Sequence, residues 1–207
     1  NRAIYIYAIC QFYRKITLIN MPIPDSIILG SQSPRRLEIL THAGFSVQVI
    51  SPNIDEVFPS EMSIYEVPEF LANLKMQEIS NTITTDDKFI ICADTVVIFN
   101  QQLIGKPTDD NQSFTFLKNM NGKQHDVITG VSIRYVGKQI SFAAMAKVFF
   151  KKLSDEEIWH YIHTHQTLDK AGAYNIQEYC GIDRIEGEFE NVMGLPIRRV
   201  LQEIQNW

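Results

Sequence analysis

The apolar positions of the chain fall in short runs that predict buried strands. The longest run, residues 89–99 (FIICADTVVIF), is nearly all apolar and rich in β-branched residues, which is typical of a central strand buried on both faces. Two later runs lie on either side of an expected turn at Gly137 and Lys138. In chain order, the predicted strands are residues 26–30, 45–50, 89–99, 127–136 and 141–150.

Helical periodicity and capping residues predict the segments between those strands. Ser33 at an N-cap, Pro34 at the first helical position and Gly44 after the last turn would bound one helix. Ser154 and Glu157 have the spacing of a capping box for another. Further helices are expected from Pro68, from Asp109 or Asp110 to Met120, and from Leu195 and Pro196. Strands that alternate with helices around one hairpin-like pair predict an α/β fold with a mixed sheet flanked by helices, in one domain with a cleft.

Residues 1–20 contain no initiator Met, and Met21 follows them. Their apolar stretch is short, and Arg14 and Lys15 come after it rather than before it, which is a poor match to a signal peptide. The stretch is also too short for a membrane span. We expect an upstream extension, with the working domain at residues 21–207; the alternative is an extra strand or an interface segment.

The overall composition indicates a globular protein without a surface for nucleic acid. The 207 residues are 45% hydrophobic and 21% charged, with a net charge of −5, which suits one well-cored domain and argues against disorder. A duplex-binding protein usually needs a basic face, and no cluster of Lys or Arg exceeds three residues. A small anionic substrate stays compatible with this charge, because a helix end and a few cations can bind phosphate.

Cysteines and histidines give no metal-binding pattern. Cys10, Cys92 and Cys180 are odd in number and widely spaced, which argues against a disulfide framework and predicts buried thiols in a reducing cytosol. No CxxC pair is present, so a structural zinc site is not expected. The three histidines within residues 160–165 lack a Cys or carboxylate partner in matching helical register. We therefore interpret them as surface residues rather than as a metal cluster.

Residues 30–36 (GSQSPRR) predict a phosphate-binding loop, because a strand runs through a short polar loop into a helix N-terminus. Free backbone N–H groups and the helix dipole would point at one place. The hydroxyls of Ser31 and Ser33 and the guanidinium groups of Arg35 and Arg36 would add donors there. The alternative is a capped helix with two solvated arginines. The segment is neither a Walker loop nor a dinucleotide-binding fingerprint, since both glycine patterns are missing.

Asp94 is a carboxylate in the middle of the apolar run. Such a group is costly unless it is paired, protonated or bound to a metal, so it marks a candidate site. The alternative is an aspartate at a strand bulge, bonded to backbone amides. Asp55 and Glu56 could bring further oxygens, which suit Mg²⁺ or Mn²⁺ rather than zinc, although alone they read as an ordinary acidic loop.

Three lysines are candidate phosphate cations. Lys106 lies between Gly105 and Pro107 in a rigid turn, and Lys170 precedes small residues that would let a ligand approach the backbone. Lys75 lies in a predicted helix. Each is weak evidence by itself, because a lone lysine is usually solvated.

Taken in order, these segments resemble the Maf family of nucleotide pyrophosphatases. The matching stretches are ILGSQSPRRLEIL, NIDE, LANLK, CADTVV, IGKP, VITGVSI, LSDEEIWHYI, LDKAGAYNIQ and IEGEFENVMGLP, which together span residues 27–199. The resemblance implies a twisted mixed sheet related to inosine triphosphate pyrophosphatases, with two lobes around a cleft. It also implies a divalent cation, Mg²⁺ or Mn²⁺, a cytoplasmic location and a homodimer as a plausible assembly.

The resemblance also assigns roles to residues. Asp94 matches the proton acceptor that activates water, so we expect Asp94, Glu56 and Lys75 to be catalytic, with Asp94 and Glu56 also facing the metal. The branch that this chain resembles acts on dTTP and UTP rather than on 7-methyl-GTP. Arg35, Thr95 and Gln177 fall on the positions associated with that choice. The expected substrate-binding set is Ser31, Ser33, Arg35, Arg36, Thr95, Lys106, Lys170 and Gln177.

Two positions and one loop depart from the family pattern. Gly30 replaces a usual Ala, and Cys92 stands where Gly is common. Residues 178–181 replace a glycine-rich loop, a change that bears on base selection.

The resemblance predicts hydrolysis of a nucleoside triphosphate to its monophosphate and pyrophosphate. The alternative is a catalytically weak nucleotide-binding regulator of septum formation. Asp94, Glu56 and the lysines are all present, which favours the enzyme.

Overall fold

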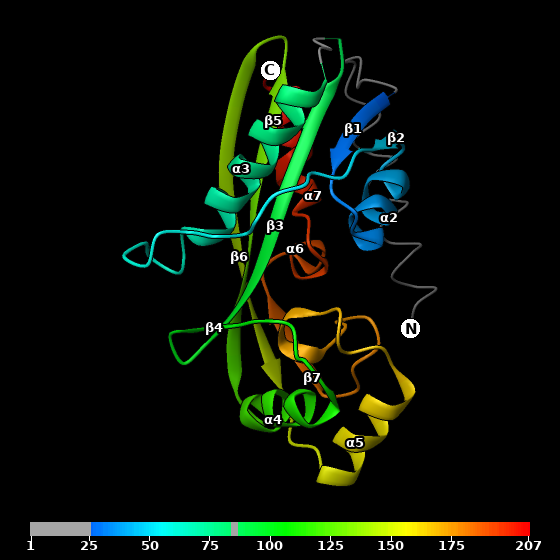
Figure 1. The fold of residues 1–207 in the computed structure, drawn as a ribbon. Coiled ribbons are helices and arrows are strands. Elements are labelled where there is room, and N and C mark those ends of the chain that lie inside the picture. Colours follow the sequence, from blue (N-terminus) through cyan, green and yellow to red (C-terminus); the bar gives the residue numbers. More distant parts are fainter. Residues whose placement is uncertain (1–25, 84–86) are drawn as a thin grey trace.

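The computed structural model describes residues 26–83 and 87–207, which form one open sheet with helices on both faces (Figure 1). The expectations for residues 1–20 and for Cys10 lie outside the described residues. The sheet has seven strands in the order β2-β1-β3-β5-β6-β7, with β4 paired to β3. The strands are β1 (Ser26–Gly30), β2 (Ser46–Val49), β3 (Phe89–Phe99), β4 (Gln102–Ile104), β5 (Gln124–Tyr135), β6 (Lys138–Phe150) and β7 (Ile182–Glu186).

The predicted mixed sheet is confirmed. β1 is parallel to both β2 and β3, whereas β4, β5, β6 and β7 join by antiparallel pairs. The longest strands, β3, β5 and β6, have 11, 12 and 13 residues and run side by side (Figure 1). The two-lobe arrangement implied by the family stays a prediction.

The two edges of β3 differ in their strand pairing, and the candidate site lies at the edge that is incompletely paired. Toward β5 the strand is paired from Ile90 to Ile98. On the other edge, the pairing with β1 stops at Cys92, and the pairing with β4 begins only at Val97. No described strand pairs with residues 93–96 on this edge. Because an unpaired strand edge leaves backbone groups and side chains accessible, a gap opens beside the middle of β3.

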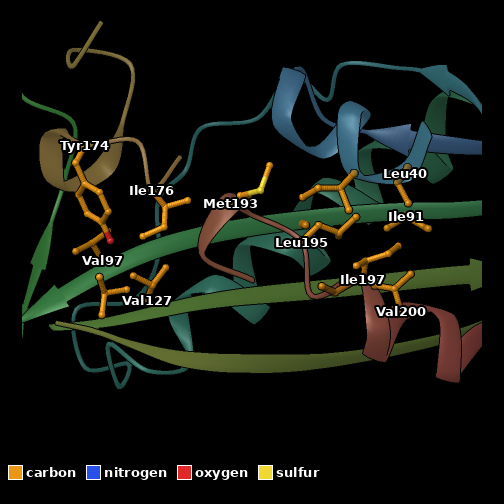
Figure 2. Packing of buried hydrophobic residues seen from close by; sticks show 14 of the residues in the cluster. Leu40, Ile91, Val97, Val127, Tyr174, Ile176, Met193, Leu195, Ile197 and Val200 are labelled. Carbon is orange, nitrogen blue, oxygen red and sulfur yellow. The ribbon is translucent and has the colours of Figure 1, made fainter. Parts of the chain in front are cut away.

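Helix α3 (Val67–Thr82) covers one face of the sheet, while α2 (Pro34–His42) and α7 (Ile197–Gln205) cover the other (Figure 1). The side chains of Met76 and Ile79 on α3 pack against β1 and β3 in a small core. The larger core lies on the opposite face and includes residues from α2, α7 and the central strands (Figure 2). The remaining helices are α4 (Asp110–Met120), α5 (Asp155–Thr164), the 3₁₀ turn Ala171–Ala173 and α6 (Phe189–Met193).

Local sequence signals account for several boundaries. Asp109 caps α4 by accepting from the Gln112 N–H at 2.8 Å. Ser154 and Glu157 form the predicted capping box of α5. Ser33 does occupy the N-cap of α2, but its side chain makes no capping bond. Across residues 26–83 and 87–207, no helix is long and apolar enough to cross a membrane.

Some sequence-based expectations were wrong in detail. The turn between β5 and β6 is Val136 and Gly137, one residue earlier than predicted, and both residues have positive φ, 47° and 73°. Two positive φ angles suit a tight hairpin because they match the twist of the strands. The thiol of Cys92 is buried as expected, whereas that of Cys180 is exposed. β4, β7 and α6 were not predicted.

Candidate active site

A cavity of about 760 Å³ opens at the gap beside β3. Asp94, Thr95 and Val96, which lie on the unpaired edge, form part of its wall. Its other walls come from the loop after β1, the segment after β2, the α3 residues Val67, Leu71 and Lys75, residues 103–106, Val127, residues 169–176 and the end of α6. All of the predicted site residues except Gln177 line this cavity: Ser31, Ser33, Arg35, Arg36, Glu56, Lys75, Asp94, Thr95, Lys106 and Lys170.

Lys75 joins two carboxylates in the cavity wall. Its Nζ lies 2.5 Å from Asp94 Oδ1 and 2.6 Å from Glu56 Oε1. Lys75 and Asp94 are each only 8% exposed, so Asp94 is a buried paired carboxylate, as its place in an apolar strand requires. Burial raises the pKa of Glu56, but the hydrogen bond and charge of Lys75 outweigh it and leave this pKa below its ordinary value.

A glycine on β5 lets α3 approach closely enough to form this pair. Gly130 lies directly opposite Asp94 in the β3–β5 register. A Cβ atom at Gly130 would be 2.2 Å from the Glu69 backbone nitrogen and 2.2 Å from the Pro68 carbonyl carbon. The first turn of α3 therefore rests on Gly130, and Lys75, two turns further along, lies over the sheet at Asp94.

Arg36 is buried and bonded to the protein rather than free in the cavity. Its Nε donates to Gly194 O at 2.8 Å, and its two Nη atoms donate to Ser31 Oγ and Thr95 Oγ1, each at 2.9 Å. Burial lowers the pKa of Arg36, while the charge of Asp94 opposes that effect. Solvated arginines, the alternative reading of this loop, are therefore wrong for Arg36. Arg35 is half-buried and makes no side-chain hydrogen bond with the described residues.

The two remaining lysines differ in their surroundings. Lys170 is 6% exposed, and its Nζ donates to Gln166 O and to Asp169 Oδ1, both at 2.6 Å. Lys106 is exposed at the mouth of the cavity. The two loops are joined because the Gly172 N–H donates to Gly105 O at 3.1 Å. Lys170 is thus already bonded to acceptors of the protein, whereas Lys106 is available to a ligand.

Part of the cavity wall is apolar. Val97 and Val127 lie opposite each other on β3 and β5, Tyr174 and Ile176 lie beside them, and Met193 lies further along the wall (Figure 2). An uncharged group suits this part, whereas the phosphates of a nucleotide suit the cationic part.

The side chain of Tyr174 forms a hydrogen bond with the buried His125. Tyr174 Oη lies 2.8 Å from His125 Nε2. Burial lowers the pKa of His125 to about 4, which keeps the ring neutral at physiological pH.

Gln177 is the one predicted site residue that the fold does not bring into the cavity wall. Its side chain is exposed, and its backbone N–H donates to Asn175 Oδ1 at 3.1 Å. Sequence reasoning also missed His125, Thr129 and Asn191, which support the wall from within the protein. Thr129 and Asn191 are both fully buried. A polar residue inside an apolar strand was the available signal for Thr129, the same signal that marked Asp94.

Comparisons with known proteins identify the family of the chain. The profile of a family described as Maf-like protein matches residues 26–207. The chain is 42% identical over 183 residues to a protein of Phocaeicola vulgatus named dTTP/UTP pyrophosphatase, a match that covers 86% of this chain and 94% of the relative. Proteins of the same name from Cytophaga hutchinsonii and Bdellovibrio bacteriovorus are 38% identical over 182 residues and 40% identical over 179 residues. These matches cover 86% and 83% of this chain, and 83% and 93% of the respective relatives.

Proposed function

The chain belongs to the Maf-like protein family, and from that premise we propose that it is a nucleoside triphosphate pyrophosphatase acting on dTTP and UTP. It would hydrolyse the bond between the α and β phosphates and release a nucleoside monophosphate and pyrophosphate. The observation that carries the proposal is a buried carboxylate, Asp94, in a cavity that also presents Arg35, Lys75, Lys106 and Lys170.

Asp94 is proposed as the general base. Its Oδ1 is held by Lys75, while Oδ2 makes no hydrogen bond with the described residues and can accept the proton of a water. That water would attack the α-phosphorus as its proton passes to Asp94. The side chains of Arg35 and Lys106 make no hydrogen bond or ion pair with the described residues and can donate to phosphate oxygens, which offsets the charge that develops there.

Glu56 and Asp94 also fit a divalent cation. Both carboxylates lie within 2.6 Å of one nitrogen atom, so their oxygens are close enough to contribute to one site. Carboxylate oxygens combined with phosphate oxygens are the ligands that Mg²⁺ and Mn²⁺ prefer. When bound, such an ion would neutralise charge on the phosphates. A cytoplasmic location and a homodimer are further proposals that rest on the family resemblance.

The test is a panel of nucleoside triphosphates incubated with Mg²⁺ or Mn²⁺, with the products separated by chromatography. We expect dTTP and UTP to give monophosphate and pyrophosphate faster than ATP or GTP does. Nucleoside diphosphate and orthophosphate as primary products would contradict the proposed bond. Nucleotide binding without turnover of any substrate would favour the alternative, a regulator of septum formation.

A further inference from the structure

Thr95 and Asp94 serve opposite faces of the sheet. Adjacent residues of a strand point to opposite faces, and Asp94 contacts Lys75 on the face covered by α3. Thr95 instead contacts Arg36 of α2 on the other face. Its neighbour two residues along, Val97, belongs to the apolar wall of the cavity. Thr95 therefore lies at the border between the cationic and the apolar parts, beside the place that an uncharged part of a substrate would occupy.

A chain of hydrogen bonds runs from Thr95 into the protein. Thr95 Oγ1 lies 2.9 Å from Thr129 Oγ1, which faces it across the β3–β5 pair. Thr129 Oγ1 lies 2.9 Å from the backbone oxygen of Asn191. The Asn191 side chain in turn donates from Nδ2 to Val127 O at 3.1 Å. Thr129 and Asn191 are 0% exposed, so neither can touch a substrate.

The number of hydroxyl protons determines which group donates and which accepts in this series of hydrogen bonds. A carbonyl oxygen can only accept, so Thr129 must donate its single hydroxyl proton to Asn191 O. Thr129 then has no proton for Thr95, and Thr95 must donate to Thr129. Arg36 donates to Thr95 from the other side. The proton of Thr95 is thus directed inward, and only a lone pair remains for the cavity.

One competing acceptor lies near Thr95. Gly194 O is 3.5 Å from Thr95 Oγ1, at the limit of a hydrogen bond. It already accepts from Arg36 Nε at the shorter distance of 2.8 Å. The Thr129 oxygen, at 2.9 Å, is therefore the better acceptor for the Thr95 proton.

We propose that Thr129 is a positioning residue that makes Thr95 an acceptor-only group toward the cavity, so that the site selects a substrate with a hydrogen-bond donor on its uncharged part. This inference rests on the proposed function. In UTP and dTTP the donor would be the ring N–H of the base. The matching nitrogen of cytosine carries a lone pair, which would face the lone pair of Thr95 and leave both groups unpaired. The 2′-hydroxyl of the ribose, which dUTP lacks, could supply the same chemistry.

The test compares kcat/KM for UTP, CTP and dUTP in the wild type and in Thr129→Val. Valine keeps the shape of threonine but removes the oxygen that holds the Thr95 proton. We expect the UTP-to-CTP ratio to fall roughly tenfold, because Thr95 can then donate to cytosine. A fall in the UTP-to-dUTP ratio instead would assign the donor to the ribose hydroxyl. Both ratios unchanged would overturn the inference.

Thr129→Ser is the matched control, since it keeps the hydroxyl and should keep both ratios. A purely structural role for Thr129 would lower the melting temperature and reduce kcat/KM equally for the three nucleotides. Should Thr129→Val fail to fold, Thr95→Val makes the same test by removing the acceptor itself, and an unchanged pair of ratios in that variant overturns the inference. Absence of UTP and dTTP turnover in the wild type would contradict the proposed function instead.

Discussion

Lys75 Nζ lies 2.5 Å from Asp94 Oδ1, and both side chains are buried beside residues 93–96 of β3, which lack a described paired strand on one edge. Charge pairing makes the burial of Asp94 tolerable, and the gap makes the same group accessible from the cavity. Because of this pair, Asp94 can be stable within an apolar strand and still be accessible to a substrate.

Gly130 lies beneath the first turn of α3. Gly130→Ala should displace the first turn of α3, because the new Cβ would overlap the backbone of Pro68 and Glu69. The shift should separate Lys75 from Asp94 and lower kcat/KM by roughly 10- to 100-fold. Gly137→Ala is the control, since Gly137 has a φ of 73° in the distant β5–β6 turn, with open space around it. It should lower the melting temperature only. Equal kinetic effects of the two variants would contradict this account of Gly130.

The adjacent arginines should behave differently. Arg35→Ala, like Lys106→Ala, should weaken transition-state binding by roughly 2–4 kcal/mol, about 30- to 1000-fold in kcat/KM, with little change in melting temperature. Arg36→Ala should in addition lower the free energy of unfolding by about 3 kcal/mol, because it removes the three hydrogen bonds that Arg36 donates to Gly194, Ser31 and Thr95. Kinetic assays and denaturant unfolding on the three variants separate these effects. An Arg36→Ala protein as stable as the wild type would refute the structural part.

The two departures at Gly30 and Cys92 should compensate each other. These residues are paired in the β1–β3 register, and a Cβ at Gly30 would lie 2.3 Å from Cys92 Sγ. Gly30→Ala alone should therefore cost about 1–3 kcal/mol of unfolding free energy. Adding Cys92→Gly should remove the overlap, which gives a coupling of at least about 1 kcal/mol in a double-mutant cycle. Additive effects would show that the two positions are independent.

His125 should make folding sensitive to acid. Burial lowers its pKa from 6.5 to about 4, so the unfolded chain takes up the proton first as the pH falls. The contribution is present above pH 6.5 and is lost as the pH falls through about 4, by up to about 3 kcal/mol. In His125→Gln this contribution is absent. Denaturant unfolding from pH 7 to pH 4 should show the stability difference between wild type and variant shrinking, whereas parallel curves would contradict the prediction.

The sequence predicted elements with strong local signals and missed those that depend on tertiary contacts. β3 was predicted with its observed bounds because its apolar run is long. β7 was missed because three of its five residues are charged, and because it pairs with residues of β6 that lie more than 30 positions earlier in the chain. α6 is only five residues long and has no capping bond from its N-cap side chain.

In the candidate site too, residues with a strong local signal were predicted and those that depend on tertiary contacts were missed. Asp94 and the loop after β1 could be recognised from sequence, because each places polar groups where the local pattern makes them conspicuous. The different roles of Arg35 and Arg36 were not foreseen, although one signal existed: Arg36 precedes the buried Ile39 and Leu40 by three and four residues, on the same helix face. The role of Thr129 was not foreseen, although its place in an apolar strand was a signal, because its contact with Thr95 is defined only by the register of β3 and β5.

The most direct test of the central claim is the turnover number of Asp94→Asn on dTTP, measured together with nucleotide affinity and melting temperature. Asparagine keeps the shape of the side chain and an oxygen near Lys75, and Lys75 keeps its contact with Glu56. We expect a folded protein that binds dTTP and turns over at least about 100-fold more slowly, because the base is gone. A variant with a lowered melting temperature and nearly wild-type turnover would contradict the proposal that Asp94 takes the proton of the attacking water.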